Sequence, residues 1–255
     1  MLIAPVADLL EEPEIIIFPD RCLYKVPFAA LKQESGRYLS ETFRVRVVPS
    51  LTTLKLIQDR PADQCSETDA LIVGDPDVSH VLSLSQLPCA RKEAEMIGRL
   101  LGVEPLFGHE AIKLAVLDMM HSASLIHIAA HGDAERGEIA LAPVRPVNRI
   151  LQQEDFVLTM SEVAEVQLRA KLVVLSCCHS GRGEVKSEGV VGIARAFLGS
   201  GARSVLVALW ALDDEATEQL ISRFYKHLVR GESASKSLHQ AMDWMRGNGY
   251  SDVRQ

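Results

Sequence analysis

The chain has 255 residues, of which 47% are hydrophobic and 24% are charged. This hydrophobic fraction excludes an intrinsically disordered protein, and the length suffices to bury a large core. The formal net charge is −7 at pH 7, and a mildly acidic chain without basic runs is a poor nucleic-acid binder, so we expect no nucleic-acid partner.

The sequence also bears on the cellular compartment. The longest hydrophobic run, 205–212, is far shorter than the roughly 20 residues that a membrane-spanning helix needs. Pro5, Asp8 and Glu11 occupy the region where a signal peptide would have a cationic start and a hydrophobic core. The 5 cysteines, an odd number without CxxC spacing, do not resemble a disulfide framework. We therefore expect a cytoplasmic protein with no membrane partner.

Short hydrophobic runs rich in β-branched residues alternate with amphipathic patterns along the chain. Most of these runs are apolar at every position, which is typical of strands that are covered on both faces. The runs that predict strands are Ile15–Phe18, Val45–Val48, Ala70–Val73, Leu125–Ala130, Leu172–Cys177 and Val205–Trp210. Strands that alternate with helices predict one α/β domain with a mostly parallel sheet and helices on both faces.

Hydrophobic residues between these strands recur at helical spacing. The predicted buried faces are Ala90, Ala94, Ile97 and Leu101; Ile112, Ala115, Val116 and Met119; Val190, Ile193, Ala194 and Phe197; Leu220, Ile221, Phe224 and Leu228; and Ala234, Leu238, Ala241, Met242 and Met245. Asp214 is predicted to cap the helix that ends near Val229, and the capping-box spacing from Thr159 predicts a short helix at 160–167.

Three segments interrupt the alternation of strands and helices. Within the polar stretch 134–154, Glu138–Leu141 predicts a short strand or hairpin. We expect a surface loop at 61–68 and a flexible loop at 181–188, because both segments are short and polar.

Two of the predicted strands end in residues that are suited to catalysis. One strand leads into His131 and Gly132, and the strand that follows it leads into Cys178. Ligands of open parallel sheets bind outside the carboxyl ends of the strands, so parallel pairing would bring His131 and Cys178 to the same edge. An imidazole beside a thiol is the arrangement that a cysteine nucleophile requires, because the ring transfers protons while the thiolate attacks a carbonyl.

The pair favours catalysis more than either residue does alone. A lone cysteine at a strand end is usually a small buried hydrophobe, and a lone histidine there is usually a hydrogen-bonded turn residue. His131 and Cys178 are 178 − 131 = 47 residues apart, and in caspases the histidine precedes the cysteine by about 50 residues. Gly132 leaves its backbone N–H unobstructed, so we expect this N–H and that of Cys178 to bind an oxyanion.

A zinc site is the competing chemical interpretation. Its candidate ligands are Cys177, Cys178, His179 and His131, but adjacent strand residues point to opposite faces, so the two cysteines cannot easily bind one ion. We therefore expect no metal. Structural or incidental roles are predicted for the remaining cysteines and for the histidine inside the strand, namely Cys22, Cys65, Cys89 and His127.

Several blocks of the sequence carry a family likeness. His127–Gly132 resembles the H-x-A-x-H-G block, and LVVLSCCHS at Leu172–Ser180 resembles the LSAC-x-T block, of CHAT domains, the caspase-like modules associated with tetratricopeptide repeats. The likeness covers nearly the whole chain in order, through Pro19–Leu31, Val73–Pro76, Glu188–Phe197, Gly201–Val205 and Leu209–Tyr225.

The resemblance implies a three-layer α/β/α domain of the caspase–hemoglobinase type, which caspases and separases share. It implies a cysteine endopeptidase, and hence a hydrolase, in which Cys178 is the nucleophile and His131 is the acid–base partner. It implies no metal or organic cofactor. The implied partners are a protein or peptide substrate and a tetratricopeptide-repeat region of the parent protein, which regulates the module.

The sequence departs from the family pattern near the nucleophile and at the ends. The small residue that usually precedes the nucleophile is Cys177 here, and His179 replaces the usual acidic or polar residue after it. By comparison with the family, Met1 enters in the middle of a helix and Gln255 precedes an aromatic closing segment. We therefore expect residues 1–255 to form a single CHAT-like domain that is truncated at both ends and carries no repeats.

A catalytically silent module is the alternative function that the sequence leaves open. In this interpretation the domain serves protein–protein interaction within a large repeat scaffold. Retention of His131 and Cys178 favours the peptidase, because a scaffold has no packing need for that pair. The lack of repeats and of the closing segment favours no detectable activity in this chain.

Acidic residues near the strand ends suggest a substrate preference. Asp133, Asp213 and Asp214 are candidate pocket residues, together with Glu135, and they predict a basic residue before the cleaved bond. Helix capping is the competing role for Asp214.

Overall fold

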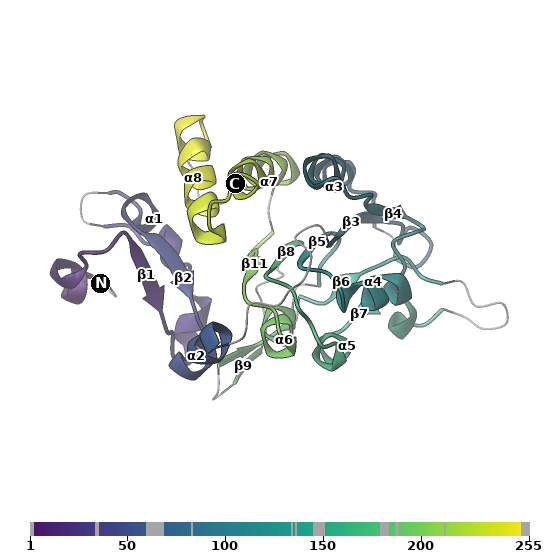
Figure 1. Ribbon diagram of the computed structural model, residues 1–255, viewed down its shortest axis with the longest axis horizontal. Coiled ribbons are helices and arrows are strands. Elements are labelled where there is room, and N and C mark those ends of the chain that lie inside the picture. The colour runs from purple at the N-terminus through teal and green to yellow at the C-terminus, as the bar shows by residue number, and fades with distance from the viewer. Residues whose placement is uncertain are drawn as a thin grey trace.

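The computed structural model describes residues 3–33, 36–59, 69–82, 84–133, 135, 137–144, 151–178, 184–186, 189–211 and 213–250. Its centre is a parallel sheet of five strands in the order β11-β8-β5-β3-β4 (Figure 1). These strands are β3 (Ala70–Pro76), β4 (Leu106–Gly108), β5 (Leu125–Ala129), β8 (Leu172–Ser176) and β11 (Val205–Val207). The predicted α/β class and the mostly parallel sheet are confirmed.

Helices cover both faces of this sheet (Figure 1). One face carries α3 (Pro88–Leu101) and α7 (Asp214–Leu228), and α8 (Ala234–Gly247) packs against α7. The other face carries α4 (Lys113–Met120), α5 (Met160–Glu165) and α6 (Ile193–Ser200). The resulting three layers explain why the central strands are apolar at every position, since both of their faces are buried.

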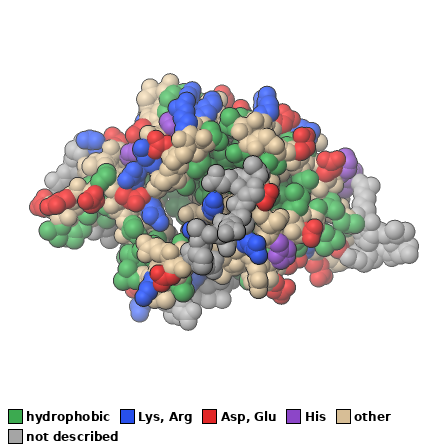
Figure 2. Space-filling view, viewed as in Figure 1, with side chains coloured by type: hydrophobic (Ala, Val, Ile, Leu, Met, Phe, Trp, Pro, Cys, Tyr) green, Lys and Arg blue, Asp and Glu red, His purple; other side chains and the backbone are tan. Residues whose placement is uncertain are grey.

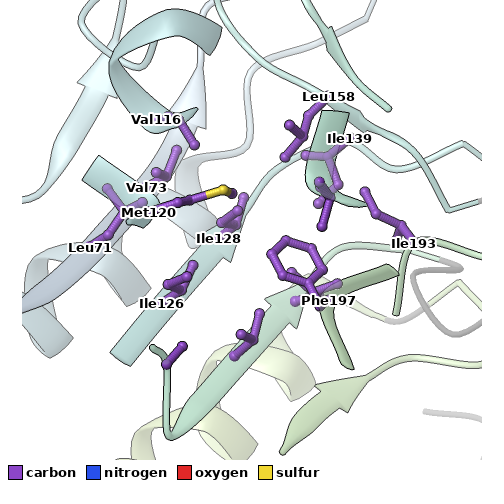
Figure 3. Packing of buried hydrophobic residues seen from close by; sticks show 14 of the residues in the cluster. Leu71, Val73, Val116, Met120, Ile126, Ile128, Ile139, Leu158, Ile193 and Phe197 are labelled. Atoms are coloured by element: carbon purple, nitrogen blue, oxygen red, sulfur yellow. The ribbon is translucent and has the colours of Figure 1, made fainter. Parts of the chain in front are cut away.

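The larger hydrophobic cluster joins β3 and β5 to α4 and α6. Figure 3 shows Met120 of α4 beside Val73 and Ile128, with Phe197 of α6 farther along the same face. Met120 and Phe197 are fully buried. Burial of a side chain of this size contributes roughly 1.5–3 kcal/mol, so this face anchors the strands whose ends carry His131 and Cys178.

The N-terminal residues form a second sheet, whereas the sequence predicted one. Its two parallel strands are β1 (Glu14–Ile17) and β2 (Arg44–Val47), accompanied by η1 (Ala4–Leu9), η2 (Arg21–Lys25), η3 (Phe28–Ala30), α1 (Leu39–Thr42) and α2 (Leu51–Asp59). Ser235 Oγ of α8 donates to Glu14 Oε1 at 2.7 Å, and Arg246 Nη1 donates to Ser40 Oγ at 3.3 Å. These contacts join β1 and α1 to the C-terminal helix α8.

Two helix ends test the predicted caps. The N-cap of α7 is Asp213, whose carboxylate accepts the N–H of Ala216 at 2.9 Å, and the prediction of Asp214 was wrong by one residue. Two successive aspartates offer the same side chain, and only the backbone decides which one lies outside the helix. The capping box of α5 is confirmed: Thr159 Oγ1 accepts the N–H of Glu162, and the Glu162 carboxylate accepts the N–H of Thr159.

Other local predictions need correction. Within the predicted flexible loop 181–188, the described residues form β9 (Glu184–Lys186), which pairs antiparallel with β10 (Gly189–Val191), so Val190 lies in a strand and not on a helix. On α4 Met120 is buried together with the predicted Val116, whereas the predicted Met119 is 38% exposed. The short strand predicted at Glu138–Leu141 is β6 (Ile139–Ala140), and it pairs antiparallel with β7 (Val157–Leu158), which the sequence did not predict, beside η4 (Gln153–Asp155).

Some predicted features lie outside the described residues. They are the loop at 61–68 with Cys65, and His179. Among the helices that the structure describes, none is long and apolar enough to cross a membrane. On the face seen in Figure 2, charged side chains of both signs are interspersed with hydrophobic ones.

A buried lysine fixes α4 to α5 and β7. Lys113 Nζ donates to Glu162 Oε1 at 2.6 Å and to the carbonyl oxygen of Val157 at 3.2 Å. Burial alone would raise the pKa of Glu162, but hydrogen bonds from Lys113 and Thr159 outweigh burial and hold this pKa below its ordinary value. A carboxyl whose pKa is lowered by folding stabilises the folded state above its unfolded pKa, and this contribution is lost as the pH falls through the folded pKa.

We expect Glu162→Gln to lower the free energy of unfolding by about 1–2 kcal/mol at pH 7, because the amide removes a charge-assisted hydrogen bond. The deficit relative to the wild type should vanish on acidification below the lowered pKa. Urea unfolding of the wild type and the variant between pH 3 and pH 7, in steps of roughly one pH unit across the ordinary carboxyl range, measures the deficit and its pH dependence. Glu165→Gln, an exposed change on the same helix, is the matched control. A deficit that is the same at every pH, or that the control shares, would contradict this role of the ion pair.

Candidate active site

The register of β5 and β8 brings their carboxyl ends to the same level. Ala129 pairs with Ser176, an offset of 176 − 129 = 47 residues. His131 and Cys178 have the same offset, 178 − 131 = 47, and each lies two residues beyond the paired strand ends. Because strand side chains alternate between faces, an offset shared with the ladder turns both residues to one side of the sheet.

A pocket of about 50 Å³ opens at this edge of the sheet. Its walls come from α3 and the residues just before it, from the ends of β5 and β8, and from the first turns of α7. His131 and Cys178 both line it. The structure therefore brings the two residues together at the site where open parallel sheets bind ligands.

Gly132 is where the two strand ends touch. A Cβ at this position would overlap the carbonyl oxygen of Cys178, so only glycine allows this approach. Gly132 forms a bridge with Ile139 whose hydrogen bonds use the carbonyl of His131 and the N–H of Asp133. That bridge does not use the N–H of Gly132.

His131 is held by the segment that follows β3. Its Nε2 donates to the carbonyl oxygen of Ser85 at 2.8 Å, since a carbonyl can only accept. In the neutral ring this assigns the proton to Nε2 and leaves Nδ1 as the nitrogen that accepts a proton.

Asp75 holds that segment in turn. Its Oδ1 accepts the N–H of Leu87 at 2.7 Å, two residues after Ser85. Asp75 has a φ of 47°, at the irregularity between Gly74 and Pro76 where β3 ends. Sequence reasoning noted Val73–Pro76 only as part of a family likeness. An aspartate two positions after the apolar run Ala70–Val73 was the one local signal for this role, and the partner at Leu87 was not visible in the sequence.

The two adjacent cysteines have opposite environments. Burial raises the pKa of the Cys177 thiol to about 12, and its Sγ donates to the carbonyl oxygen of Ile128 at 3.4 Å. Cys177 therefore stays a neutral thiol within the core. Both cysteines line the pocket, but only Cys178 is partly exposed, so it is the thiol of this pair that a substrate reaches. Among the described residues, no group of three or more His, Cys, Asp or Glu is arranged to hold a metal ion.

Of the acidic residues that the sequence suggested for the substrate pocket, the structure places only one in the lining. Asp214 lines the pocket from the start of α7, whereas Asp213 caps that helix and Asp133 pairs through its N–H with the carbonyl of Glu138. Neither Asp213 nor Asp133 is among the described residues that line this pocket. Glu135 is an exposed residue of the same turn as Asp133.

Glu93 of α3 lines the pocket and was missed from the sequence. It is 2% exposed and lies on the buried face of α3 beside Ala94 and Ile97. A carboxylate within the apolar stripe of an amphipathic helix is unusual, and this was the available signal.

His127 is a buried partner of Glu93. Its Nδ1 lies 3.1 Å from the hydroxyl oxygen of Tyr225, and its Nε2 lies 2.9 Å from Glu93 Oε1. The contact with Glu93 has the distance of an ion pair but not the geometry of a hydrogen bond. Burial raises the pKa of Tyr225 well above its ordinary value, so this side chain remains a neutral hydroxyl. His127 is thus a core histidine, as predicted, and it lies behind the pocket.

The chain is similar to known proteins along most of its length. A family model described as "CHAT domain" matches residues 1–252. Tetratricopeptide repeat protein 28 of Mus musculus and that of Homo sapiens are each 30% identical to it over 271 residues. The match covers 90% of this chain and 11% of each relative, so the chain spans about a tenth of their length.

Two solved structures share the fold at low sequence identity. The Arg-specific cysteine proteinase gingipain R matches with a TM-score of 0.56 and 10% identity, over 80% of this chain and 50% of that chain. The Saccharomyces cerevisiae separase–securin complex matches with a TM-score of 0.58 and 15% identity, over 82% of this chain and 13% of that chain. The fold is therefore caspase-like, with the three layers that the sequence predicted.

Gly132→Ala tests the contact between the strand ends. We expect the added methyl group to push the Cys178 backbone away and to lower the free energy of unfolding by roughly 1–3 kcal/mol, the usual cost of overpacking. Urea unfolding of the purified variant measures this. Gly199→Ala in α6 is the control, because a Cβ there meets nothing within 4 Å and alanine favours helix by about 1 kcal/mol over glycine. A Gly132→Ala protein as stable as the control would contradict the contact.

Proposed function

The chain belongs to the CHAT domain family, and we propose that it is a caspase-like cysteine endopeptidase module with Cys178 as nucleophile and His131 as acid–base partner. The observation that carries this proposal is the shared register of the two residues on neighbouring strands, which open into one pocket. Their placement at the ligand-binding edge of the sheet supports the same conclusion. The partner of the reaction is a protein or peptide substrate.

The proposed reaction proceeds in two steps. The Cys178 thiolate attacks the peptide carbonyl carbon, and the C=O electron pair moves onto the oxygen, which the N–H groups of Gly132 and Cys178 bind. As the C–N bond breaks, His131 gives its Nδ1 proton to the leaving amine, and a thioester remains on Cys178. Water then gives a proton to His131 and attacks the thioester, which releases the carboxylic acid product and restores the thiolate.

The hydrogen bond from His131 to Ser85 suits this cycle. The Nε2 proton remains on the ring because it is hydrogen-bonded to the carbonyl oxygen of Ser85. Nδ1 is therefore the nitrogen that alternates between the protonated and the free state. Asp75 supports the arrangement by holding the backbone at Leu87. We therefore assign Ser85 and Asp75 to positioning the ring.

A catalytically silent interaction module within a large repeat protein is the second candidate function. The similarity to tetratricopeptide repeat protein 28 favours it, because the match covers only 11% of that relative. In both cases we propose a repeat region of the parent protein as the partner that controls or uses the module. Free thiols at Cys22, Cys89, Cys177 and Cys178 fit a reducing compartment such as the cytoplasm.

The pH dependence of thiol alkylation separates the two candidates. Mass spectrometry gives the rate of iodoacetamide alkylation at each cysteine, in the wild type and in His131→Ala. We expect Cys178 at pH 6 to react at least about tenfold faster than the exposed Cys22, because a neighbouring imidazolium favours the thiolate. His131→Ala should abolish this difference.

Cys89 is an internal control in the wall of the same pocket. Burial raises the pKa of its thiol, and the carboxylates of Glu218 and Asp214 raise it further. A raised pKa means less thiolate at a given pH, so Cys89 should react only at higher pH. If Cys178 reacts no faster than Cys22 and ignores His131→Ala, the silent module becomes the better conclusion.

A further inference from the structure

We infer that the pocket beside Cys178 receives a lysine or arginine side chain, and that Glu93 and Asp214 are the carboxylates that select it. The inference rests on the proposed function, because it concerns the substrate residue whose carbonyl carbon Cys178 attacks. It replaces the three aspartates predicted from the sequence with one of them and a glutamate from α3.

The walls of the pocket suit a long side chain with a cationic end. Leu87, Ala90 and Ala130 supply hydrocarbon surface, while Glu93 and Asp214 supply carboxylates from two different helices. Lysine and arginine combine an aliphatic stem with a charged head. Such a side chain places its stem against the apolar wall and its head beside the carboxylates, whereas an acidic side chain would meet like charge.

Glu93 is a buried carboxylate with an incomplete set of partners. Its side chain is 3% exposed, and its Oε1 makes the contact with His127 but no hydrogen bond. Burying a carboxylate is costly unless it is paired, so a cationic group that enters the pocket beside Glu93 offsets part of this cost. The other ring nitrogen of His127 is occupied by the hydroxyl of Tyr225, so the ring stays fixed behind Glu93.

The start of α7 adds negative charge at the rim. Asp214 is exposed there and lines the pocket, beside the exposed Glu215. The thiol of Cys89, in the pocket wall, reports this field: burial is the main cause of its raised pKa, and Glu218, Asp214 and Glu215 raise it further. Lys92 opposes them with a single positive charge. The charges around the pocket mouth are therefore mostly negative, which favours the binding of a cation.

Peptidyl acyloxymethyl ketones test the selection directly. In this reaction the cysteine sulfur bonds to the methylene carbon of the probe and displaces a carboxylate, so one labelling event leaves a stable thioether. Four probes share one peptide and end in lysine, arginine, norleucine or aspartate. Norleucine keeps the aliphatic stem of lysine without the amine. We expect the lysine and arginine probes to label Cys178 about tenfold faster than norleucine, and the aspartate probe to be slowest.

Variants link the preference to the carboxylates. Asp214→Asn, an exposed change, should reduce the ratio of lysine to norleucine labelling, and Glu93→Gln should reduce it further. Glu104→Gln is the control, because Glu104 is an exposed carboxylate just after α3 that is neither among the described residues that line the pocket nor among the charges that act on Cys89. Asp214→Asn keeps the test valid if Glu93→Gln disturbs the core.

The outcomes distinguish this inference from the proposed function. Equal labelling of Cys178 by lysine and norleucine probes, or faster labelling by aspartate, overturns the basic preference and leaves Cys178 as a working nucleophile. A preference for lysine that survives both carboxylate variants overturns the assignment of Glu93 and Asp214. Failure of all four probes to label Cys178 overturns the proposed function, and the inference falls with it.

Discussion

The candidate site depends on the parallel pairing of β5 with β8. The ladder fixes an offset of 47 residues, and His131 and Cys178 keep that offset beyond the strand ends. Because a shift of one residue would turn a side chain to the opposite face, the packing of both faces holds the register. Gly132 then allows the two strand ends to touch, which no residue with a Cβ would permit.

The layers on the two faces give neighbouring residues different properties. Cys177 points into the core against α4, α5 and α6, and burial keeps its thiol neutral. Cys178 lies on the α3 and α7 side, where the pocket opens. On that side Glu93 lines the pocket, and His127 and Tyr225 place polar groups behind it. The same sheet therefore provides an inert thiol and an accessible one at consecutive positions.

Much of the fold followed from local patterns in the sequence. Runs that are apolar at every position predicted the strands of the main sheet, because strands between two layers of helices have no solvent-facing side. The pattern failed where neighbouring residues are chemically alike: Asp213 and Asp214 both suit a cap, and Met119 and Met120 both suit a buried face. It also gave no sign that β1 and β2 form a separate sheet, since pairing is a long-range choice.

The sequence by itself determined the class of fold and singled out His131 and Cys178 as candidates, because strands, glycines and the residues that end strands are marked by their immediate neighbours. The partners of those residues were decided only by the tertiary structure. Ser85 reaches His131 from after β3, Asp75 secures that approach, and Glu93 reaches the pocket from α3. Each lies on a different segment from its partner, and the distance between two segments is set by packing, which no local pattern encodes.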